Sequence, residues 1–190
     1  MTELTFPFSE RAVRALKLGE AVSITGPIHT GRDKFHKYFA DGGKLPIDFR
    51  DGALYHCGPV IVGKPGAWKV VAAGPTTSVR ENPYEPSFIE KTGVRLIIGK
   101  GGMDAATLAA MKKCGCVYIA AVGGAAALAA QSVQQVEGVD FLEEFGFAEA
   151  CWHFNMKGFR GIVAMDAHGH SLFEQVQAQS NQTLVKLLHA

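Results

Sequence analysis

The chain has 190 residues, 47% of them hydrophobic, and a formal net charge of +1. This apolar content is enough to bury a sizeable core, which excludes general disorder, and the length suits one domain. Charged residues make up only 19% of the chain, and their near balance argues against a nucleic-acid or membrane-surface partner, because such partners need a clustered excess of Lys and Arg.

Helices and strands alternate in the hydrophobic pattern along the whole chain. In chain order, the first half is expected to hold a helix at residues 9–18, a strand at 21–28, a helix at 31–39, strands at 54–62 and 68–73, a helix at 86–92 and a strand at 94–98. The second half is expected to hold a helix at 104–113, a strand at 117–122, a helix at 124–135, strands at 150–156 and 161–166 and a helix at 171–189. The pattern predicts an α/β fold, a mixed sheet flanked by helices, in one domain over residues 1–190.

Targeting and redox signals are few. The most apolar stretch, residues 117–130, is interrupted by Gly123 and Gly124 and is shorter than the roughly 20 residues of a membrane-spanning helix. The first residues have no basic region and no continuous apolar run, so we expect a cytoplasmic protein. Free thiols without a metal-ligand spacing are expected at Cys57, Cys114, Cys116 and Cys151.

An arginine at the expected start of a helix marks the first candidate site. Asp33 complements the helix dipole there, whereas Arg32 places a cation at the positive end. Such a cation is favourable when an anion also binds, held by free backbone N–H groups and the guanidinium together. His36 lies one turn later on the same side as Arg32. The alternative, which residue types alone favour, is a surface ion pair between Arg32 and a nearby acid.

Hydroxyl side chains define the second candidate site. Residues 74–80 follow the end of an expected strand and place three hydroxyls before Arg80, namely Thr76, Thr77 and Ser78. Short neutral donors beside a bidentate cation suit a carboxylate. A threonine hydroxyl can also transfer a proton when its surroundings lower its pKa. The alternative is an ordinary turn whose hydroxyls bond to their own backbone.

A lysine among glycines is the third candidate. Lys100 follows a buried strand and lies between Gly99 and Gly101. A lysine in a glycine-rich loop at the carboxyl end of a strand is a common anion site in α/β proteins, although a flexible loop with a solvated lysine is the alternative. Since all three segments follow expected strands, parallel pairing would bring them to one sheet edge. Three cations with several hydroxyls would then suit a small dicarboxylate.

A further set of polar residues follows the strand at residues 161–166. Asp166, His168 and His170 alternate, so an extended strand would place them on one face as a possible metal site. Gly169 and Ser171 favour a strand-to-helix turn instead.

Several motifs together carry a resemblance. They are Thr30-Gly31-Arg32-Asp33 with His36, Leu45-Pro46 with Asp48, Gly58-Pro59, Gly74-Pro75-Thr76-Thr77-Ser78 with Arg80, and Ile98-Gly99-Lys100-Gly101. This pattern resembles the β subunit of the iron–sulfur class I fumarase and L(+)-tartrate dehydratase family, which is equivalent to the C-terminal domain of the single-chain enzymes. The resemblance runs from Leu4 to about Phe173. It implies a swivelling β/β/α domain.

The resemblance also implies chemistry and partners. The family reaction is the reversible addition of water across the trans double bond of a dicarboxylate. A 4Fe-4S cluster acts as the Lewis acid, and its cysteines belong to a partner α subunit, so we expect a complex of the α2β2 type. By the resemblance, Thr76 is the candidate base for the C–H proton and His36 is an acid/base or orienting residue. Substrate carboxylates are expected to bind Arg32, Arg80 and Lys100, with help from Thr77 and Ser78.

Two departures from the family pattern affect the expected substrate. Met is common after the motif arginine, where this chain has Glu81, and Ala or Cys is common before the first arginine, where it has Gly31. Glu81 lowers the local positive potential. Residues 120–127 look more like fumarases than tartrate dehydratases, so we expect fumarate hydration to malate. The alternatives are an L(+)-tartrate dehydratase β subunit and a non-catalytic anion-binding subunit.

Overall fold

Strands and helices alternate through residues 1–189, the part of the chain that this computed structural model describes. The first half holds β1 (Thr2–Thr5), α1 (Glu10–Ala15), β2 (Ala21–Thr30), α2 (Asp33–Ala40), β3 (Ala53–Tyr55), β4 (Val60–Val62), β5 (Lys69–Ala72), the 3-10 helix η1 (Ser78–Glu81) and α3 (Glu85–Thr92). The second half holds β6 (Leu96–Gly99), α4 (Ala105–Cys114), β7 (Val117–Ala120), α5 (Ala126–Gln131), β8 (Val133–Asp140), α6 (Leu142–Phe145), β9 (Cys151–Met165) and α7 (Leu172–Leu188). The expected mixed α/β fold is confirmed.

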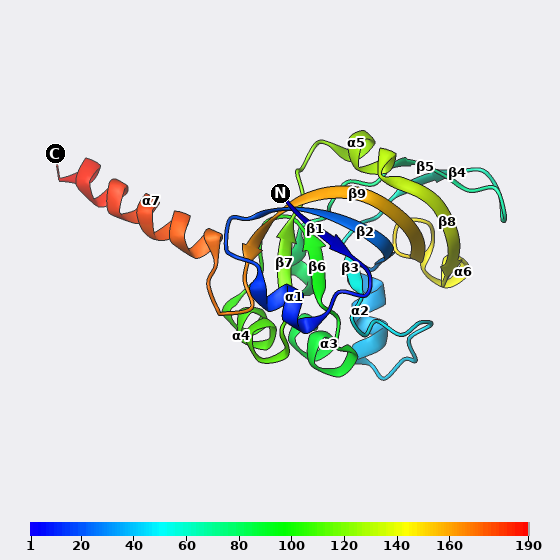
Figure 1. Cartoon of the computed structure of the whole chain (residues 1–190), viewed down its shortest axis with the longest axis horizontal. Coiled ribbons are helices and arrows are strands. Elements are labelled where there is room, and N and C mark those ends of the chain that lie inside the picture. The colour runs from blue at the N-terminus through cyan, green and yellow to red at the C-terminus, as the bar shows by residue number, and fades with distance from the viewer. Residues whose placement is uncertain (190) are drawn as a thin grey trace.

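The main sheet closes on itself. Its strand order is β1-β2-β3-β6-β7-β9-β8, and an additional pairing joins β2 to β9. The pairs β2–β3, β3–β6 and β6–β7 are parallel, whereas β9 runs antiparallel to both β7 and β2. These five strands therefore form a barrel-like ring (Figure 1). Strands β4 and β5 form a separate antiparallel hairpin, which lies beside α5.

Strand alternation divides the apolar side chains between two cores. Tyr55, Ile98 and Ile119 belong to the core that the ring encloses, where they pack with residues such as Trp152. Their strand neighbours Leu54, Ile97 and Tyr118 point the other way, into the core beneath the helices that also contains Phe35 and Phe88. Because successive side chains of a strand face opposite sides, each buried strand serves both cores.

Local sequence signals predicted the ends of several helices correctly. Asp104 accepts a hydrogen bond from the Thr107 backbone N–H and caps α4, as its residue type predicts. Gly93 ends α3 in the left-handed conformation with φ of 71°, which glycine adopts without strain.

Pairing between distant segments accounts for the strand predictions that were wrong. The expected helix at 124–135 stops at Gln131, and Val133–Asp140 forms β8 because it pairs with β9. The strand expected at 54–62 is split into β3 and β4 around Gly58 and Pro59. The two strands expected at 150–156 and 161–166 are one 15-residue strand. An unpredicted strand, β1, runs parallel to β2.

Most of the last helix lies away from both cores, although its first residues, Leu172 and Phe173, pack against the core beneath the helices. Helix α7 contains no buried residue, and Figure 1 shows it projecting away from the body of the molecule. Its exposed apolar side chains include Val176, Leu184 and Leu188. Within residues 1–189, no helix is both long enough and apolar enough to cross a membrane.

The close approach of β9 to β7 gives a test of the ring. An added Cβ at Gly161 would lie 2.3 Å from Cγ2 of Ile119 and 3.1 Å from the Ala120 carbonyl oxygen. We therefore expect Gly161→Ala to lower the free energy of unfolding by about 1–3 kcal/mol. The matched control is Gly123→Ala, whose added Cβ meets only Lys100 Cδ, at 3.7 Å, and should change stability by less than about 0.5 kcal/mol. Urea unfolding of the full chain measures both, and equal stabilities would contradict the ring geometry.

Candidate functional site

The carboxyl ends of the parallel strands meet at one edge of the sheet. Strand β2 ends at Thr30, just before Arg32, and β6 ends at Gly99, just before Lys100. Strand β3 lies between them in parallel pairing and ends just before His56. The carboxyl ends of parallel strands are where ligands bind in both open and closed α/β sheets. The expected convergence of the Arg32 and Lys100 segments therefore follows from the parallel pairing.

Residues 76–80 reach the same edge by another route. We expected their preceding strand to belong to the main sheet, but β5 pairs only with β4 in the separate hairpin. The segment returns to the main sheet through single bridges, because the Thr76 N–H donates to the His56 carbonyl at 2.7 Å and Thr77 bridges to Lys100. The Ser78 N–H then donates to the Lys100 carbonyl at 3.0 Å. Backbone bonds thus fix this loop directly beside the ends of β3 and β6.

Two guanidinium groups share one carboxylate oxygen at this edge. The Nη2 atom of Arg80 lies 3.1 Å from Oδ2 of Asp33, and Nη2 of Arg32 lies 3.7 Å from the same oxygen. Arg80 Nη2 also donates to Thr76 Oγ1 at 2.9 Å. Residues 32–33 and 76–80 are at least 43 positions apart in sequence, yet they place two cations at a single carboxylate oxygen and a hydroxyl beside one of these cations.

The Arg32 side chain is the more firmly held of the two. Its Nη1 donates to the Ala148 carbonyl at 3.2 Å, and its Nη2 pairs with Glu149 Oε1 at 3.2 Å. A Cβ at Gly58 would come within 2.5 Å of Nη1, so only glycine at 58 leaves room for this guanidinium. The buried Nε of Arg32 has no hydrogen-bond partner within residues 1–189. The surface ion pair considered from the sequence does form, and it lies inside the cationic cluster.

Lys100 contributes an uncommitted ammonium group. Its backbone is pinned between Thr76 and Ser78, and its side chain runs past Gly123, where an added Cβ would lie 3.7 Å from Cδ. The side chain forms no ion pair within the described residues, 1–189, and the residue is half-buried. Thr76 is also half-buried, whereas Thr77 and Arg80 are exposed.

Two of the predicted site residues lie below this surface. His36 and Ser78 are both fully buried. The Ser78 hydroxyl bonds to His56 Nδ1 and to the Tyr118 hydroxyl, both at 2.8 Å, so it faces inward and not toward Thr76 and Arg80. The ring of His36 faces Glu85 and the Arg32 carbonyl. The rings and hydroxyl that these two residues contribute therefore contact buried groups, and the substrate role expected of Ser78 stays a prediction.

A buried acid–histidine cluster underlies the cationic surface. Glu85 Oε2 lies 3.0 Å from His36 Nε2 and 3.1 Å from His56 Nε2. Burial alone would lower the pKa of His36, but the carboxylates of Glu85 and Glu81 raise it to about 9. Burial likewise opposes ionisation of Glu85, yet the two imidazoles lower its pKa to about 2. Burial lowers the pKa of His56. The cluster therefore holds one ion pair, His36 with Glu85, and one neutral histidine.

The same cluster is the one group within residues 1–189 whose metal-ligating atoms gather, with His36, His56 and Glu85 atoms within 4.8 Å of one another. His56 Nε2 hydrogen-bonds to the Glu85 carboxylate and His36 Nε2 lies at ion-pair distance from it, so the three groups already pair with one another without an ion. Within residues 1–189 the cysteines do not join any such group. Burial raises the pKa of Cys57, Cys116 and Cys151, and their positions do not offer the gathered thiolates that hold an iron–sulfur cluster.

The sequence reasoning missed His56, Glu85 and Tyr118. Glu85 gave the weakest signal of the three, because an acid at the start of a helix is ordinarily exposed and nothing in the local sequence indicates its burial. His56 follows a strand end just as Lys100 does, and this position was a usable signal. Asp166 behaves as the turn interpretation predicted, since its Oδ1 accepts from the backbone N–H groups of His168 and His170, both at 2.9 Å.

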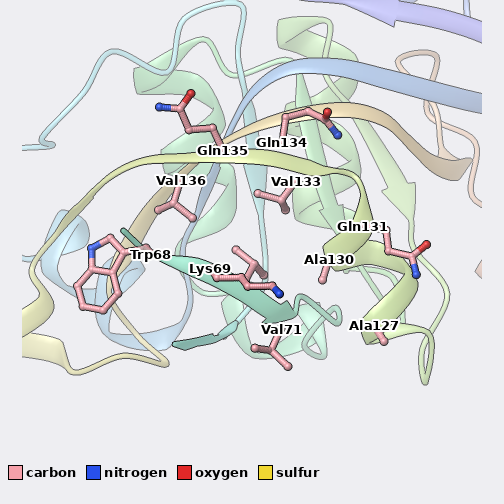
Figure 2. Close-up of a pocket in the computed structure, with 11 residues that line it drawn as sticks. Trp68, Lys69, Val71, Ala127, Ala130, Gln131, Val133, Gln134, Gln135 and Val136 are labelled. Atoms are coloured by element: carbon pink, nitrogen blue, oxygen red, sulfur yellow. The ribbon is translucent and has the colours of Figure 1, made fainter. Parts of the chain in front are cut away.

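Hollows elsewhere on the surface do not involve the predicted residues. One of about 600 Å³ lies between β5, α5 and β8 and is lined by Trp68, Val71, Val133 and Val136 among others (Figure 2). Another of about 380 Å³ includes Pro75 and lies against the start of the Thr76 segment. Neither is lined by Arg32, Thr76, Arg80 or Lys100.

Comparison with known proteins identifies the family. The model of the family described as Fumarase C-terminus matches residues 2–176. The chain belongs to the Fumarase C-terminus family. It is 40% identical over 192 residues to a Methanocaldococcus jannaschii protein provisionally named an L(+)-tartrate dehydratase subunit beta, covering 98% of each chain. It is 34% identical over 174 residues to the L(+)-tartrate dehydratase subunit beta of Escherichia coli, covering 90% of this chain and 86% of that one.

A third relative is longer. The chain is 48% identical over 182 residues to a Geobacillus stearothermophilus protein provisionally named a fumarate hydratase class I. The match covers 95% of this chain but only 35% of that relative, so this Fumarase C-terminus chain spans about a third of it. These relatives are named as a fumarate hydratase class I and as L(+)-tartrate dehydratase subunits beta, so their names do not agree on one substrate.

Glu81 gives this family member a testable pH dependence. Burial raises its pKa from 4.5 to about 7, aided by the charges of Asp33 and Glu85 and opposed by those of His36 and Arg80. Because the folded state binds this proton more tightly than the unfolded state, the contribution of Glu81 to stability falls as pH rises from about 4.5 to about 7. The side chain of the Glu81→Gln variant does not ionise. The melting temperature of the variant minus that of the wild type should therefore increase from pH 5 to pH 8.

The control for this measurement is Glu143→Gln, which removes an exposed glutamate from α6. Its melting temperature should follow that of the wild type by a constant offset across the same range. A constant offset for Glu81→Gln as well would contradict the buried, proton-binding state of Glu81.

Proposed function

We propose that this chain is the β subunit of a hydro-lyase that reversibly hydrates fumarate to malate. The observation that carries the proposal is the meeting of the Arg32 and Arg80 guanidinium groups at one carboxylate oxygen of Asp33. That contact is an internal example of the chemistry that the site would offer to a substrate carboxylate. The family to which the chain belongs supports the same reading.

The cations of the site match a four-carbon dianion. Arg32 and Arg80 are two cations at one place, and Lys100 is a third whose ammonium forms no ion pair within residues 1–189. Each charge-assisted hydrogen bond contributes about 1.5–3 kcal/mol, so three or four of them can hold a small diacid with little apolar contact. We assign one substrate carboxylate to the two arginines and Thr77, and the other to Lys100.

Thr76 is the candidate base for the C–H proton. Its hydroxyl accepts a hydrogen bond from Arg80 Nη2, and this guanidinium would stabilise negative charge on the hydroxyl oxygen. Loss of a proton beside a carboxylate spreads negative charge into that carboxylate, and preorganised cations such as Arg32 and Lys100 stabilise that charge without rearrangement. The threonine and the cations therefore act at the same step.

A partner would supply the rest of the site. The cysteines of this chain do not fit an iron–sulfur cluster, so we assign the 4Fe-4S cluster to an α subunit in an α2β2 complex. The exposed position of Thr77 and Arg80 supports this division, because a site open on one side can be completed by a second chain. The M. jannaschii and E. coli relatives are both named as subunits beta.

A second candidate substrate is L(+)-tartrate. It is favoured by the names of the two relatives that this chain matches over most of their length, whereas the more similar G. stearothermophilus relative favours fumarate. A non-catalytic anion-binding subunit is the third candidate, and it would need the same cations but not the Thr76 hydroxyl.

Removing a cation tests the carboxylate roles. In the complex reconstituted without oxygen from this chain and its α subunit, Arg80→Ala or Lys100→Ala should lower kcat/KM for fumarate by about 100-fold or more, because each removes a charge-assisted contact that strengthens in the transition state. Lys69→Ala is the control, since Lys69 lies exposed on β5. Near-normal kcat/KM in the arginine and lysine variants would remove them from the site.

Removing the hydroxyl separates the candidate functions. Thr76→Val should lower the turnover rate of the complex by at least about 1000-fold while changing the dissociation constant for a dicarboxylate by less than about fivefold. Turnover of fumarate and of tartrate by the wild-type complex decides between the substrates. This chain alone should turn over neither, and robust activity without the α subunit would contradict the divided site. Unchanged turnover in Thr76→Val would point to the anion-binding function.

A further inference from the structure

Glu85 contacts the residues that support two loops of the proposed site, the Arg32 loop and the loop of residues 76–80. It lies fully buried at the start of α3, and a single oxygen, Oε2, faces the Nε2 atoms of both His36 and His56. Its other oxygen, Oε1, has no hydrogen-bond partner within residues 1–189. The rings of the two histidines lie edge to face with their centroids 5.2 Å apart. One carboxylate oxygen therefore holds both imidazoles in place.

One arrangement of protons accounts for the hydrogen bonds of this series and for the ion pair of His36 with Glu85, in which His36 Nε2 makes no hydrogen bond within residues 1–189. With His56 neutral, its Nε2–H donates to Glu85 and its Nδ1 accepts from the Ser78 hydroxyl. The Ser78 oxygen can then accept from the Tyr118 hydroxyl. With His36 charged, its Nε2–H faces Glu85 and its Nδ1–H donates to the Arg32 carbonyl at 2.9 Å. The ionised form of Glu85 is what gives both histidines a defined orientation.

The two ends of this series reach the residues that bind substrate in the proposed function. The Arg32 carbonyl accepts both the His36 ring N–H and the His36 backbone N–H, which fixes the first turn of α2. At the other end, Ser78 carries a backbone N–H that donates to the Lys100 carbonyl. Helix η1, which includes Arg80, begins at Ser78. The buried series thus runs beneath all three cationic segments.

Stability alone does not explain a buried charge of this kind. Removing an ion pair from water costs several kcal/mol per ion, and apolar residues of similar volume often stabilise a fold as well or better. Two further carboxylate oxygens of Glu81 are buried in the same cluster without hydrogen-bond partners in the described part of the chain, which adds to that cost. What the cluster provides is a fixed geometry beneath the surface residues.

We propose that Glu85 is a positioning residue that holds the Arg32 loop through His36 and the loop of residues 76–80 through His56 and Ser78. The proposal rests on the proposed function, because it assigns these loops to dicarboxylate binding. Glu85 does not touch the substrate. Its effect is to keep the two guanidinium groups at the spacing that a carboxylate requires, and a displacement of about 1 Å in such a site can cost about 100-fold in rate.

Glu85→Gln tests the proposal with little change of volume. In the reconstituted complex we expect kcat/KM for the turned-over dicarboxylate to fall by about tenfold to 100-fold, and the inhibition constant of succinate, a dicarboxylate that cannot be hydrated, to rise by at least about tenfold. Glu90→Gln is the matched control on the same helix, because Glu90 is exposed and, among residues 1–189, pairs only with Lys113. It should leave both quantities unchanged.

Hydrogen exchange of the full chain gives a readout that does not need activity. In Glu85→Gln, the amides of residues 31–36 and 76–81 should both exchange faster, by about tenfold. Ser78→Ala cuts only the branch through His56, so residues 76–81 should exchange faster while residues 31–36 stay protected. This split distinguishes a positioning role from a general loss of stability, which would accelerate exchange throughout the core.

The outcomes separate the two proposals. If the wild-type complex neither turns over fumarate or tartrate nor binds succinate, the proposed function fails, and the exchange pattern alone decides whether Glu85 holds the loops. If the wild-type complex is active and Glu85→Gln matches it in kcat/KM, succinate inhibition and exchange, the positioning role is overturned. A lower melting temperature with unchanged kinetics and unchanged loop exchange would also overturn it, because Glu85 would then be structural only.

Discussion

Gathering like charges at one edge of a sheet costs electrostatic free energy, and the site depends on how the fold offsets that cost. Oδ2 of Asp33 faces the guanidinium groups of both Arg32 and Arg80, and Glu149 pairs with the same Nη2 atom of Arg32. Both carboxylates are partly exposed, so a dicarboxylate bound as proposed would compete with them for the same cations. In the chain without substrate, these carboxylates keep the arginines in place and oriented toward an acidic group.

The fold brings the cationic segments to the same sheet edge in two ways. Parallel pairing of β2, β3 and β6 places the residues after each strand at a common edge, which accounts for Arg32 and Lys100. The segment carrying Thr76 and Arg80 follows a hairpin outside the main sheet and is fixed by backbone bonds to His56 and Lys100. Beneath both, the Glu85 cluster provides buried contacts that surface residues alone cannot make. The site is therefore built from a rigid strand edge, an inserted loop and a polar support under them.

The motif residues and most helices could be predicted from the sequence because local chemistry determines them. Features that depend on contacts between distant segments could not be predicted. Arg32 was identifiable because a cation at a helix N-terminus is unfavourable unless an anion is near, and Lys100 because glycines surround it. In contrast, the predicted helix ran on to residue 135, whereas the chain from Val133 to Asp140 forms β8, because it pairs with β9, which begins 11 residues after β8 ends. Ser78 and Thr76 are two residues apart in a hydroxyl run, yet one is buried and the other is not. Which hydroxyl faces inward depends on His56 and Tyr118, and no local pattern encodes that contact.

The most direct test of the proposed function is a structure of the complex between this chain and its α subunit with a dicarboxylate bound. We expect one carboxylate of the ligand to lie within about 3 Å of the Arg32 and Arg80 guanidinium groups, and the other within about 3 Å of the Lys100 ammonium. The Thr76 hydroxyl should face the carbon that loses its proton, while Glu85 stays beneath the site without touching the ligand. A dicarboxylate bound elsewhere on this chain, beyond the reach of those three cations, would contradict the claim that this sheet edge is the substrate site.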